Sequence, residues 1–344
     1  VLGFLYGSLA RVLGPTAEYP YFVRAIQPLN RSTIDNADAT YLAAPIDGQY
    51  SYTIRGRAGD TSAWRGGIAP AGRRKAPHYV IFQTPSGYAG DSGSLAELAP
   101  GSRVNCDVLD SDDLQVGDDG RFEILLAPSR PEGYAGNFMR TVATKTRRDR
   151  EGRETTREYS ARFVVLRELF YDWETEDLLE LFIYRNDRLG APMPACTPDA
   201  AARQMDDIGR CTRNQVLFWN EFYAVTLEAY GGRNGQPSRT MPRNAFNEPN
   251  AASLATAGGM TTNIYAGGIY ELADDEALIV ELHQPIEPQY IGFHLGNLWG
   301  ESLDFANYQS SLNAFQAHRD PDNVLRYVIS QRDPGVANWV DTTG

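Results

Sequence analysis

Apolar and polar residues alternate over short stretches of this chain, beginning near residue 41. Tyr50, Tyr52 and Ile54 alternate with polar residues, and Gly56 follows them. A period of two matches the alternation of side chains in a half-buried β-strand. Short apolar stretches predict seven further strands, at residues 78–82, 103–108, 122–126, 160–169, 278–282, 290–295 and 325–330. The pattern therefore predicts a mainly β protein.

Turn residues separate several of these stretches. The sequence Gly-Asp-Asp-Gly at 117–120 precedes the strand predicted at 122–126. Glycine adopts positive φ angles without steric cost, and aspartate tolerates them. Several short strands joined by such turns are typical of a β-sandwich.

Two regions have helical spacing instead. Residues 1–35 carry apolar residues at helical intervals, although three prolines interrupt them. In the second region, Thr197 and Pro198 fit the N-cap and first position of a helix. Glycines at 231–232 fit its end. We predict two helices there, broken near Gly209, as a connector between two β regions.

These patterns divide the chain into four segments. We predict an N-terminal helical segment at 1–40, a β-sandwich domain at 41–190, a helical connector with a long loop at 191–262, and a C-terminal jelly-roll part at 263–344. The loop at 233–262 is rich in Asn, Pro, Gly and Ala. A charged run at 145–158 fits a polyanion-binding patch or a solvated hairpin tip, and its interleaved acidic residues favour the hairpin tip.

Charge narrows the classes of partner. The 344 residues carry 32 basic and 44 acidic side chains, a net charge of −12. This sign disfavours nucleic acid and anionic membrane surfaces. No apolar stretch reaches the length of a membrane span. We therefore expect a soluble protein of the cytoplasm or periplasm, with no nucleic-acid partner.

Cysteine and cofactor motifs are sparse. The three cysteines, Cys106, Cys196 and Cys211, fit ordinary thiols, with a bond between the last two as the alternative in an oxidising compartment. No CxxC motif, Cys/His cluster or nucleotide-binding motif occurs, so we expect no metal and no cofactor.

The C-terminal third resembles the bacterial proteins of the domain of unknown function 1214 family. The residues that carry the resemblance are Asp-Glu-Ala-Leu at 275–278, Gly-Phe-His-Leu-Gly-Asn-Leu-Trp at 292–299, Ser-Leu-Asp-Phe-Ala-Asn-Tyr-Gln-Ser-Ser-Leu-Asn at 302–313, and the run from Tyr327 to Gly344. Residues 169–176, 119–124 and 36–41 are similar to the same proteins more weakly. The resemblance implies tandem β-sandwich or jelly-roll domains, and it implies no established reaction; with the helices predicted at 191–262, the expected fold is tandem β-sandwich or jelly-roll domains with a helical connector.

The densest polar cluster lies inside the resembling region. Trp299 is followed by carboxylates and amides that fit the wall of a ligand pocket, with the indole as an apolar platform. In that reading the acid and base are Glu301 and Asp304. The alternative is a loop that hydrogen-bonds to itself. The other candidate ligand-binding residues of the cluster are Asn307, Gln309 and Asn313.

Three further groups are candidates. Asn338 and Trp339 follow an Asp-Pro-Gly turn and fit either the rim of the same pocket or the turn itself. His294 lies in an apolar strand, where it is either a core histidine or a general base. The carboxylates at 172, 174 and 176 share one face if their strand continues, and they fit a cation or acid–base site or a solvated surface.

Two functions remain open from the sequence. The first is an enzyme of hydrolase or lyase type acting on a small organic or sugar-like substrate, with Asp304, Glu301 and His294 as candidate catalytic residues. The second is a non-catalytic ligand-binding or self-assembling module, in which exposed aromatic side chains form a recognition or subunit surface. A small-molecule ligand and a homo-oligomer are both compatible with the sequence.

Overall fold

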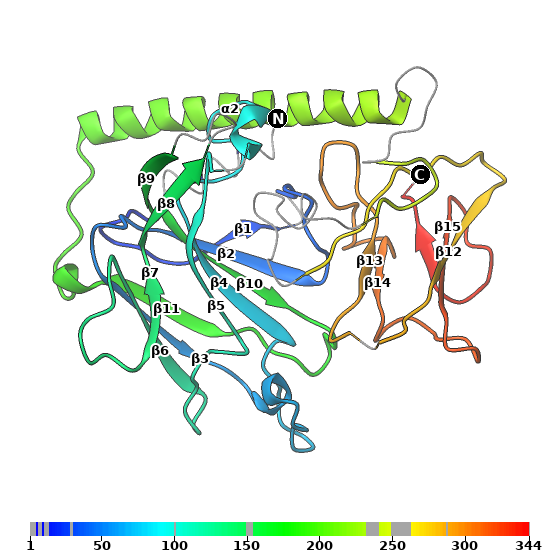
Figure 1. Cartoon of the computed structure of the whole chain (residues 1–344), viewed down its shortest axis with the longest axis horizontal. Coiled ribbons are helices and arrows are strands. Elements are labelled where there is room, and N and C mark those ends of the chain that lie inside the picture. Colours follow the sequence, from blue (N-terminus) through cyan, green and yellow to red (C-terminus); the bar gives the residue numbers. More distant parts are fainter. Residues whose placement is uncertain are drawn as a thin grey trace. The chain divides into compact units, whose positions relative to one another are not determined.

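The computed structural model of the chain is built mainly from β-strands (Figure 1). It describes residues 5, 9, 14–27, 30–99, 101–148, 154–231, 241–248, 263–286 and 288–343. These residues divide into two compact units. Unit 1 comprises Val1–Asn30, Thr40–Ser92 and Ala96–Gln215, and unit 2 comprises Arg31–Ala39, Gly93–Leu95 and Val216–Gly344. Each unit therefore combines segments that are distant in the sequence.

Unit 1 contains a five-stranded sheet in the order β1-β2-β10-β4-β5 and a four-stranded sheet in the order β11-β3-β6-β7. A separate hairpin pairs β8 with β9. The strands are β1 (Val23–Ile26), β2 (Ala39–Pro45), β3 (Tyr52–Arg57), β4 (Tyr79–Pro85), β5 (Asn105–Asp110), β6 (Arg121–Ala127), β7 (Asn137–Arg140), β8 (Val142–Arg148), β9 (Glu154–Ser160), β10 (Phe163–Leu169) and β11 (Glu180–Arg185). Short 3-10 helices lie at Ser62–Arg65, Leu95–Leu98 and Asn186–Arg188.

One hydrophobic core serves both sheets of unit 1. Alternate residues of β3, β4, β6 and β10 point into it, as the period of two requires. Phe82 of β4 and Phe122 of β6 meet edge to face, with ring centroids 6.3 Å apart. Buried core residues from the two sheets include Tyr52, Ile54, Val80, Phe82, Ile124, Leu126, Val164 and Leu166.

Unit 2 has smaller sheets. Strand β15 (Leu325–Ser330) pairs antiparallel with β12 (Ala277–Leu282) and parallel with β16 (Trp339–Asp341). Strand β13 (Gly292–His294) pairs antiparallel with β14 (Ser311–Asn313). The core of this unit contains Leu295, Leu312, Leu325, Tyr327, Ile329 and Val340.

The helix α2 runs unbroken from Pro198 to Gly231. Thr197 accepts a hydrogen bond from the backbone N–H of Ala200 on its Oγ1 atom at 3.2 Å, so the predicted N-cap is confirmed. The predicted break near Gly209 is wrong. One helical glycine costs about 1 kcal/mol relative to alanine, which a helix of 34 residues tolerates. No helix in the described part of the chain is long and apolar enough to cross a membrane.

The other predicted elements have mixed outcomes. All eight predicted strands correspond to observed strands, with bounds shifted by a few residues. The helix predicted over 1–35 is wrong for Val23–Ile26, which forms strand β1, whereas Leu5 and Leu9 are helical. The charged run at 145–158 enters the β8–β9 hairpin, and residues 149–153 at its centre lie outside the described residues. Most of the loop predicted at 233–262 lies outside them too.

Candidate functional site

Unit 2 gathers two buried carboxylates and a histidine from distant parts of the sequence. Asp35 and Asp38 lie in the segment that precedes β2, and both are buried. His294 is the last residue of β13. The two carboxylates interact electrostatically with His294. We call these three residues, with Tyr290, Ser302 and Asn313, the His294 cluster.

Ser302 donates a hydrogen bond to each carboxylate oxygen of Asp35. The backbone N–H of Ser302 donates to Asp35 Oδ1 at 2.9 Å, and the Ser302 hydroxyl donates to Asp35 Oδ2 at 2.7 Å. Burial raises the pKa of Asp35 above its ordinary value of 3.8, and the two bonds from Ser302 oppose that shift. Because the hydroxyl proton of Ser302 points at Asp35, this serine is not arranged as a nucleophile activated by histidine.

Asp38 is bound by the side chain of Tyr290, which precedes β13, and by that of Asn313, the last residue of β14. The Tyr290 hydroxyl donates to Asp38 Oδ2 at 2.8 Å, and Asn313 donates through Nδ2 to Asp38 Oδ1 at 3.2 Å. Asn313 is itself fully buried and accepts two backbone N–H bonds, from Phe315 and Gln316. Both oxygens of Asp38 are therefore held in fixed directions.

His294 is half-buried as a residue, but one of its ring nitrogens is fully buried. Its Nδ1 atom is buried and has no hydrogen-bond partner among the described residues. Burial lowers the pKa of His294 below its ordinary value of 6.5, while Asp38 and Asp35 oppose that shift. The imidazole is therefore neutral at neutral pH. Asp35 and Asp38 favour its protonated form electrostatically.

The backbone that carries Asp35 is strained. Thr33 and Ile34 have φ angles of 66° and 53°, in the left-handed region that β-branched residues rarely adopt. The N–H of Ile34 donates to the carbonyl of Gly300 at 2.7 Å, which holds this conformation. Such strain costs on the order of 1–3 kcal/mol a residue, and it concentrates at functional sites.

The carboxylates predicted as acid and base lie in a loop that bonds to itself. Glu301 accepts a hydrogen bond from Asn297 on Oε2 at 2.8 Å, and Asp304 accepts one from Asn307 on Oδ2 at 2.8 Å. These pairs are exposed. Their catalytic role stays a prediction, and of the predicted catalytic residues only His294 lies in the His294 cluster.

The predicted ligand-binding residues are distributed over unit 2. Trp299 stacks on Tyr223 with ring centroids 4.7 Å apart, so one face of its indole is covered. Asn338 has a φ of 57° and bonds to the backbone of His318 and Arg326, which makes it part of a turn. Two further predicted residues meet each other, because Gln309 donates through Nε2 to the carbonyl of Trp339 at 2.5 Å.

The carboxylates at 172, 174 and 176 do not share a strand face, because β10 ends at Leu169. Glu176 is buried and accepts backbone N–H bonds from His78 and Tyr171, each at 3.0 Å. Asp172 instead accepts a bond from the hydroxyl of Thr175 and lies 3.5 Å from the Lys75 ammonium. Among the described residues, no group of three His, Cys, Asp or Glu side chains is placed to hold a metal ion.

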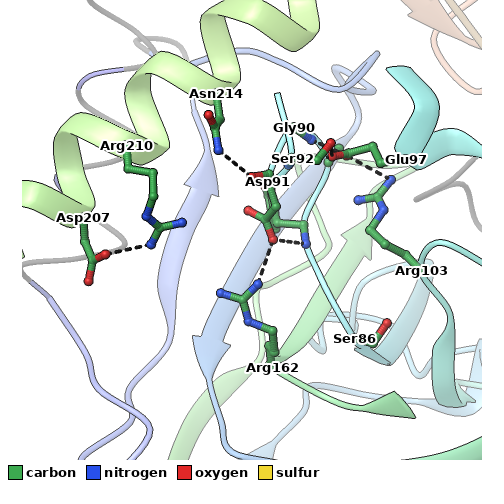
Figure 2. A network of polar contacts seen from close by, with 12 residues as sticks. Ser86, Gly90, Asp91, Ser92, Glu97, Arg103, Arg162, Asp207, Arg210 and Asn214 are labelled. Atoms are coloured by element: carbon green, nitrogen blue, oxygen red, sulfur yellow. Dashed lines mark hydrogen bonds and ion pairs between the residues drawn. The ribbon is translucent and has the colours of Figure 1, made fainter. Parts of the chain in front are cut away.

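A second polar network lies in unit 1 and is structural in character (Figure 2). The buried carboxylate of Glu97 accepts N–H bonds from Gly90 at 2.5 Å and Ser92 at 2.8 Å, and it also accepts the Ser92 hydroxyl. The guanidinium of Arg103 lies 3.9 Å from it. Asp91 pairs with Arg162 at 3.2 Å, and its carbonyl accepts a bond from Asn214 of α2 at 2.7 Å. These bonds fix the connection after β4.

Sequence reasoning missed four of the six residues of the His294 cluster. Asp35, Asp38, Tyr290 and Ser302 were not singled out, because Asp35 and Ser302 are 267 residues apart. The weak similarity of residues 36–41 to the resembling family was the only signal that pointed to this segment.

Comparisons with known proteins show a shared fold and assign no function. No family model matches the chain, and no curated protein matches it. An uncharacterized protein from Burkholderia cenocepacia is similar over 99% of this chain and 79% of that chain, with 23% identity and a TM-score of 0.75. A protein from Vibrio parahaemolyticus is similar over 90% of this chain and 82% of that chain, with 9% identity and a TM-score of 0.40. The first of these shows that the fold is shared with an uncharacterized protein.

Proposed function

We propose that unit 2 carries an acid–base site centred on His294, in an enzyme of hydrolase or lyase type that acts on a small organic or sugar-like substrate. The observation that carries this proposal is a neutral, half-buried imidazole beside two buried carboxylates. Groups whose pKa is shifted by burial and by specific charged neighbours concentrate at catalytic sites. The jelly-roll and tandem-sandwich assignment, and the likeness to the domain of unknown function 1214 family, belong to the same proposal.

The roles follow from the contacts. Nδ1 of His294 is buried, so a substrate contacts the ring at Nε2. This nitrogen takes a proton from a substrate C–H, from a hydroxyl or from an attacking water, and later returns it to the leaving group. Asp35 and Asp38 stabilise the imidazolium formed between these steps. The bond from Ser302 to Asp35 favours direct proton transfer or water attack over an acyl-serine intermediate.

The strain at Thr33 and Ile34 supports this assignment. A backbone held in an unfavourable conformation directly before Asp35 fixes the carboxylate where a relaxed loop would not. The fixed bonds to Asp38 act in the same direction. Both carboxylates are therefore set in place before a substrate arrives, which is the arrangement that electrostatic catalysis requires.

Turnover by the His294→Gln variant tests the proposal. The whole chain is incubated with a panel of nitrophenyl esters, nitrophenyl glycosides, lactones and hydroxy acids, in D2O so that proton exchange at carbon is also recorded by NMR. We expect the wild type to convert or exchange one class, and the variant to be slower by about 10²–10⁴-fold at unchanged melting temperature. His318→Gln, which changes an exposed histidine, is the matched control and keeps full activity.

The alternative function is a non-catalytic ligand-binding module. One observation favours it: each of the four oxygens of Asp35 and Asp38 already accepts a hydrogen bond from the protein. In that case the cluster serves to tie residues 31–39 to the rest of unit 2. If the wild type converts nothing in the panel and His294→Gln is altered only in stability, the catalytic proposal is contradicted. That result supports a structural role, in which the cluster holds residues 31–39 against the rest of unit 2.

The stability of the protein is expected to depend on pH through His294. Its pKa is lower in the folded chain than in the unfolded chain, so the unfolded chain binds more protons below about pH 6.5. The neutral imidazole therefore makes its full contribution to the free energy of unfolding above that pH, and this contribution is lost as the pH falls below it. The raised pKa values of Asp35, Glu168 and Glu176 act in the opposite direction.

The measurement is therefore a difference between two chains. Urea denaturation at a series of pH values from 4 to 8 gives the free energy of unfolding of the wild type and of His294→Gln. We expect the wild type to lose stability relative to His294→Gln as the pH falls below about 6.5. A difference in free energy of unfolding that does not change with pH would show that His294 has the same pKa in the folded and unfolded chains.

A further inference from the structure

Among the residues that the structure describes, the three-stranded sheet of unit 2 has one covered edge and one open edge. Beyond β16, the backbone N–H of Asp341 donates to the carbonyl of Gln309 at 2.8 Å, and the Gln309 side chain bonds to Trp339. Beyond β12, no segment of the described chain adds a strand (Figure 1). An open edge presents unpaired N–H and C=O groups to any strand that can reach it.

Strand β12 also lacks several of the features that keep natural edge strands apart. Its six residues, Ala277–Leu282, contain no lysine and no proline, and its pairing with β15 has no bulge. Its single charged residue, Glu281, is paired with Arg326 of β15 at 2.8 Å. At its centre, Ile279 is 60% exposed. An edge with an exposed apolar residue at its centre is suited to pairing with another strand.

We propose that two copies of this chain pair antiparallel through β12, around a two-fold axis at Ile279, and so join their three-stranded sheets into one. A two-fold axis perpendicular to a sheet keeps each side chain on its own face. Opposed residues must therefore be both odd-numbered or both even-numbered. An axis at Ile279 places the two Ile279 side chains opposite each other on the exposed face.

The ends of β12 are complementary in this register. Asp275 lies in the turn before the strand and His283 directly after it, and both are exposed. The two-fold axis brings Asp275 of one copy to the end that carries His283 of the second copy, at both ends of the joint. Ala277 faces Glu281 of the second copy, so no like charges are opposed.

The neighbouring register is less favourable. An axis at Val280 places Ile279 opposite Glu281 of the second copy, which removes the apolar pair at the centre. Asp275 before the strand and His283 after it are opposite in character, so an antiparallel copy of β12 places each beside its complement. This self-complementarity is the reason for assigning the edge to a second copy of the chain and not to a foreign strand.

Sedimentation equilibrium of the whole chain tests the proposal. We expect the wild type to have twice the monomer mass at micromolar concentration. We expect Ile279→Lys to raise the dimer Kd about 100-fold, because two like charges opposed in an interface cost several kcal/mol. Ile286→Lys is the control, because Ile286 is 83% exposed but lies outside the strands. A monomeric wild type, a dimer that Ile279→Lys leaves intact, or equal loss in both variants overturns the proposal.

Cross-linking gives a second readout that does not depend on weakening the fold. In a chain whose exposed Cys196 and half-buried Cys211 are replaced by serine, Ile279→Cys is expected to form an intermolecular disulfide under mild oxidation. Opposed residues of antiparallel strands have Cα atoms about 4.5–5.5 Å apart, within the range of a disulfide. Ile286→Cys in the same background is expected to remain uncrosslinked. Equal cross-linking of the two variants contradicts the register.

Discussion

Replacing Glu97 with alanine is expected to lower the free energy of unfolding by about 3–5 kcal/mol. The buried carboxylate of Glu97 accepts three hydrogen bonds, two from backbone N–H groups of Gly90 and Ser92 and one from the Ser92 hydroxyl. Its removal leaves these donors without an acceptor. It also leaves the guanidinium of Arg103, whose Nε and Nη2 atoms are buried and unbonded, without its neighbouring negative charge.

Two variants in the same network separate the causes. Glu97→Gln keeps the shape but offers one oxygen in place of two, so it should destabilise the protein by less than Glu97→Ala. Asp207→Asn breaks only an exposed ion pair with Arg210, seen at the edge of Figure 2, and should change stability little. Urea denaturation of the four chains makes the comparison. If Glu97→Ala unfolds at the same urea concentration as Asp207→Asn, the network contributes nothing to stability.

Replacing Gly120 with alanine is the second large effect that the structure predicts. Gly120 has a φ of 79° in the turn before β6, and an added Cβ would lie 2.4 Å from the backbone oxygen of Ala58. That carbonyl cannot move away easily, because the backbone N–H of Ala58 donates to the carbonyl of Gly120 at 2.8 Å. The positive φ costs about 1–2 kcal/mol, and the overpacking adds about 1–3 kcal/mol.

Gly133→Ala is the matched control. Gly133 has almost the same φ, 75°, but a Cβ added there meets no heavy atom within 4 Å. Its free energy of unfolding should therefore fall only by the backbone contribution, about 1–2 kcal/mol. The difference between the two variants, measured by urea denaturation, isolates the clash with Ala58. Equal losses in both variants would contradict the close approach of the two turns.

The strands were predictable because a local pattern specifies them. Alternation around Ile54 marks β3, and the Gly-Asp-Asp-Gly sequence before Phe122 marks the turn into β6. Both signals lie within one element and its adjoining turn. The mainly β character of the chain follows from repeating this reasoning, and the structure confirms it.

The errors arose where tertiary contacts override local preference. The segment around Val23 has helical spacing, yet Val23–Ile26 pairs with β2 as an edge strand of the five-stranded sheet. Pairing with an existing sheet supplies backbone hydrogen bonds that local spacing does not anticipate. The reverse holds at Gly209, where packing of α2 through buried residues such as Ile208 and Phe218 outweighs the low helix propensity of glycine.

The candidate site was only partly predictable. His294 and Asn313 were recognisable because they lie in a strand pattern and a polar cluster. Asp35 and Asp38 belong to a segment without such a pattern, and their partners lie more than 250 residues away. No spacing rule within one sequence links residues at that distance. The structure supplies the link, through the bonds to Ser302, Tyr290 and Asn313.

The assembly of unit 2 from segments far apart in the sequence has a consequence for synthesis on the ribosome. Asp35 emerges 267 residues before Ser302, its partner. At a translation rate of about 5–20 residues per second, the segment waits roughly ten to fifty seconds for the strands that bury it. During that interval two carboxylates are fully hydrated and ionised. Closure of unit 2 therefore comes only after Ser302 has been synthesised, and it must withdraw both carboxylates from water in one late step.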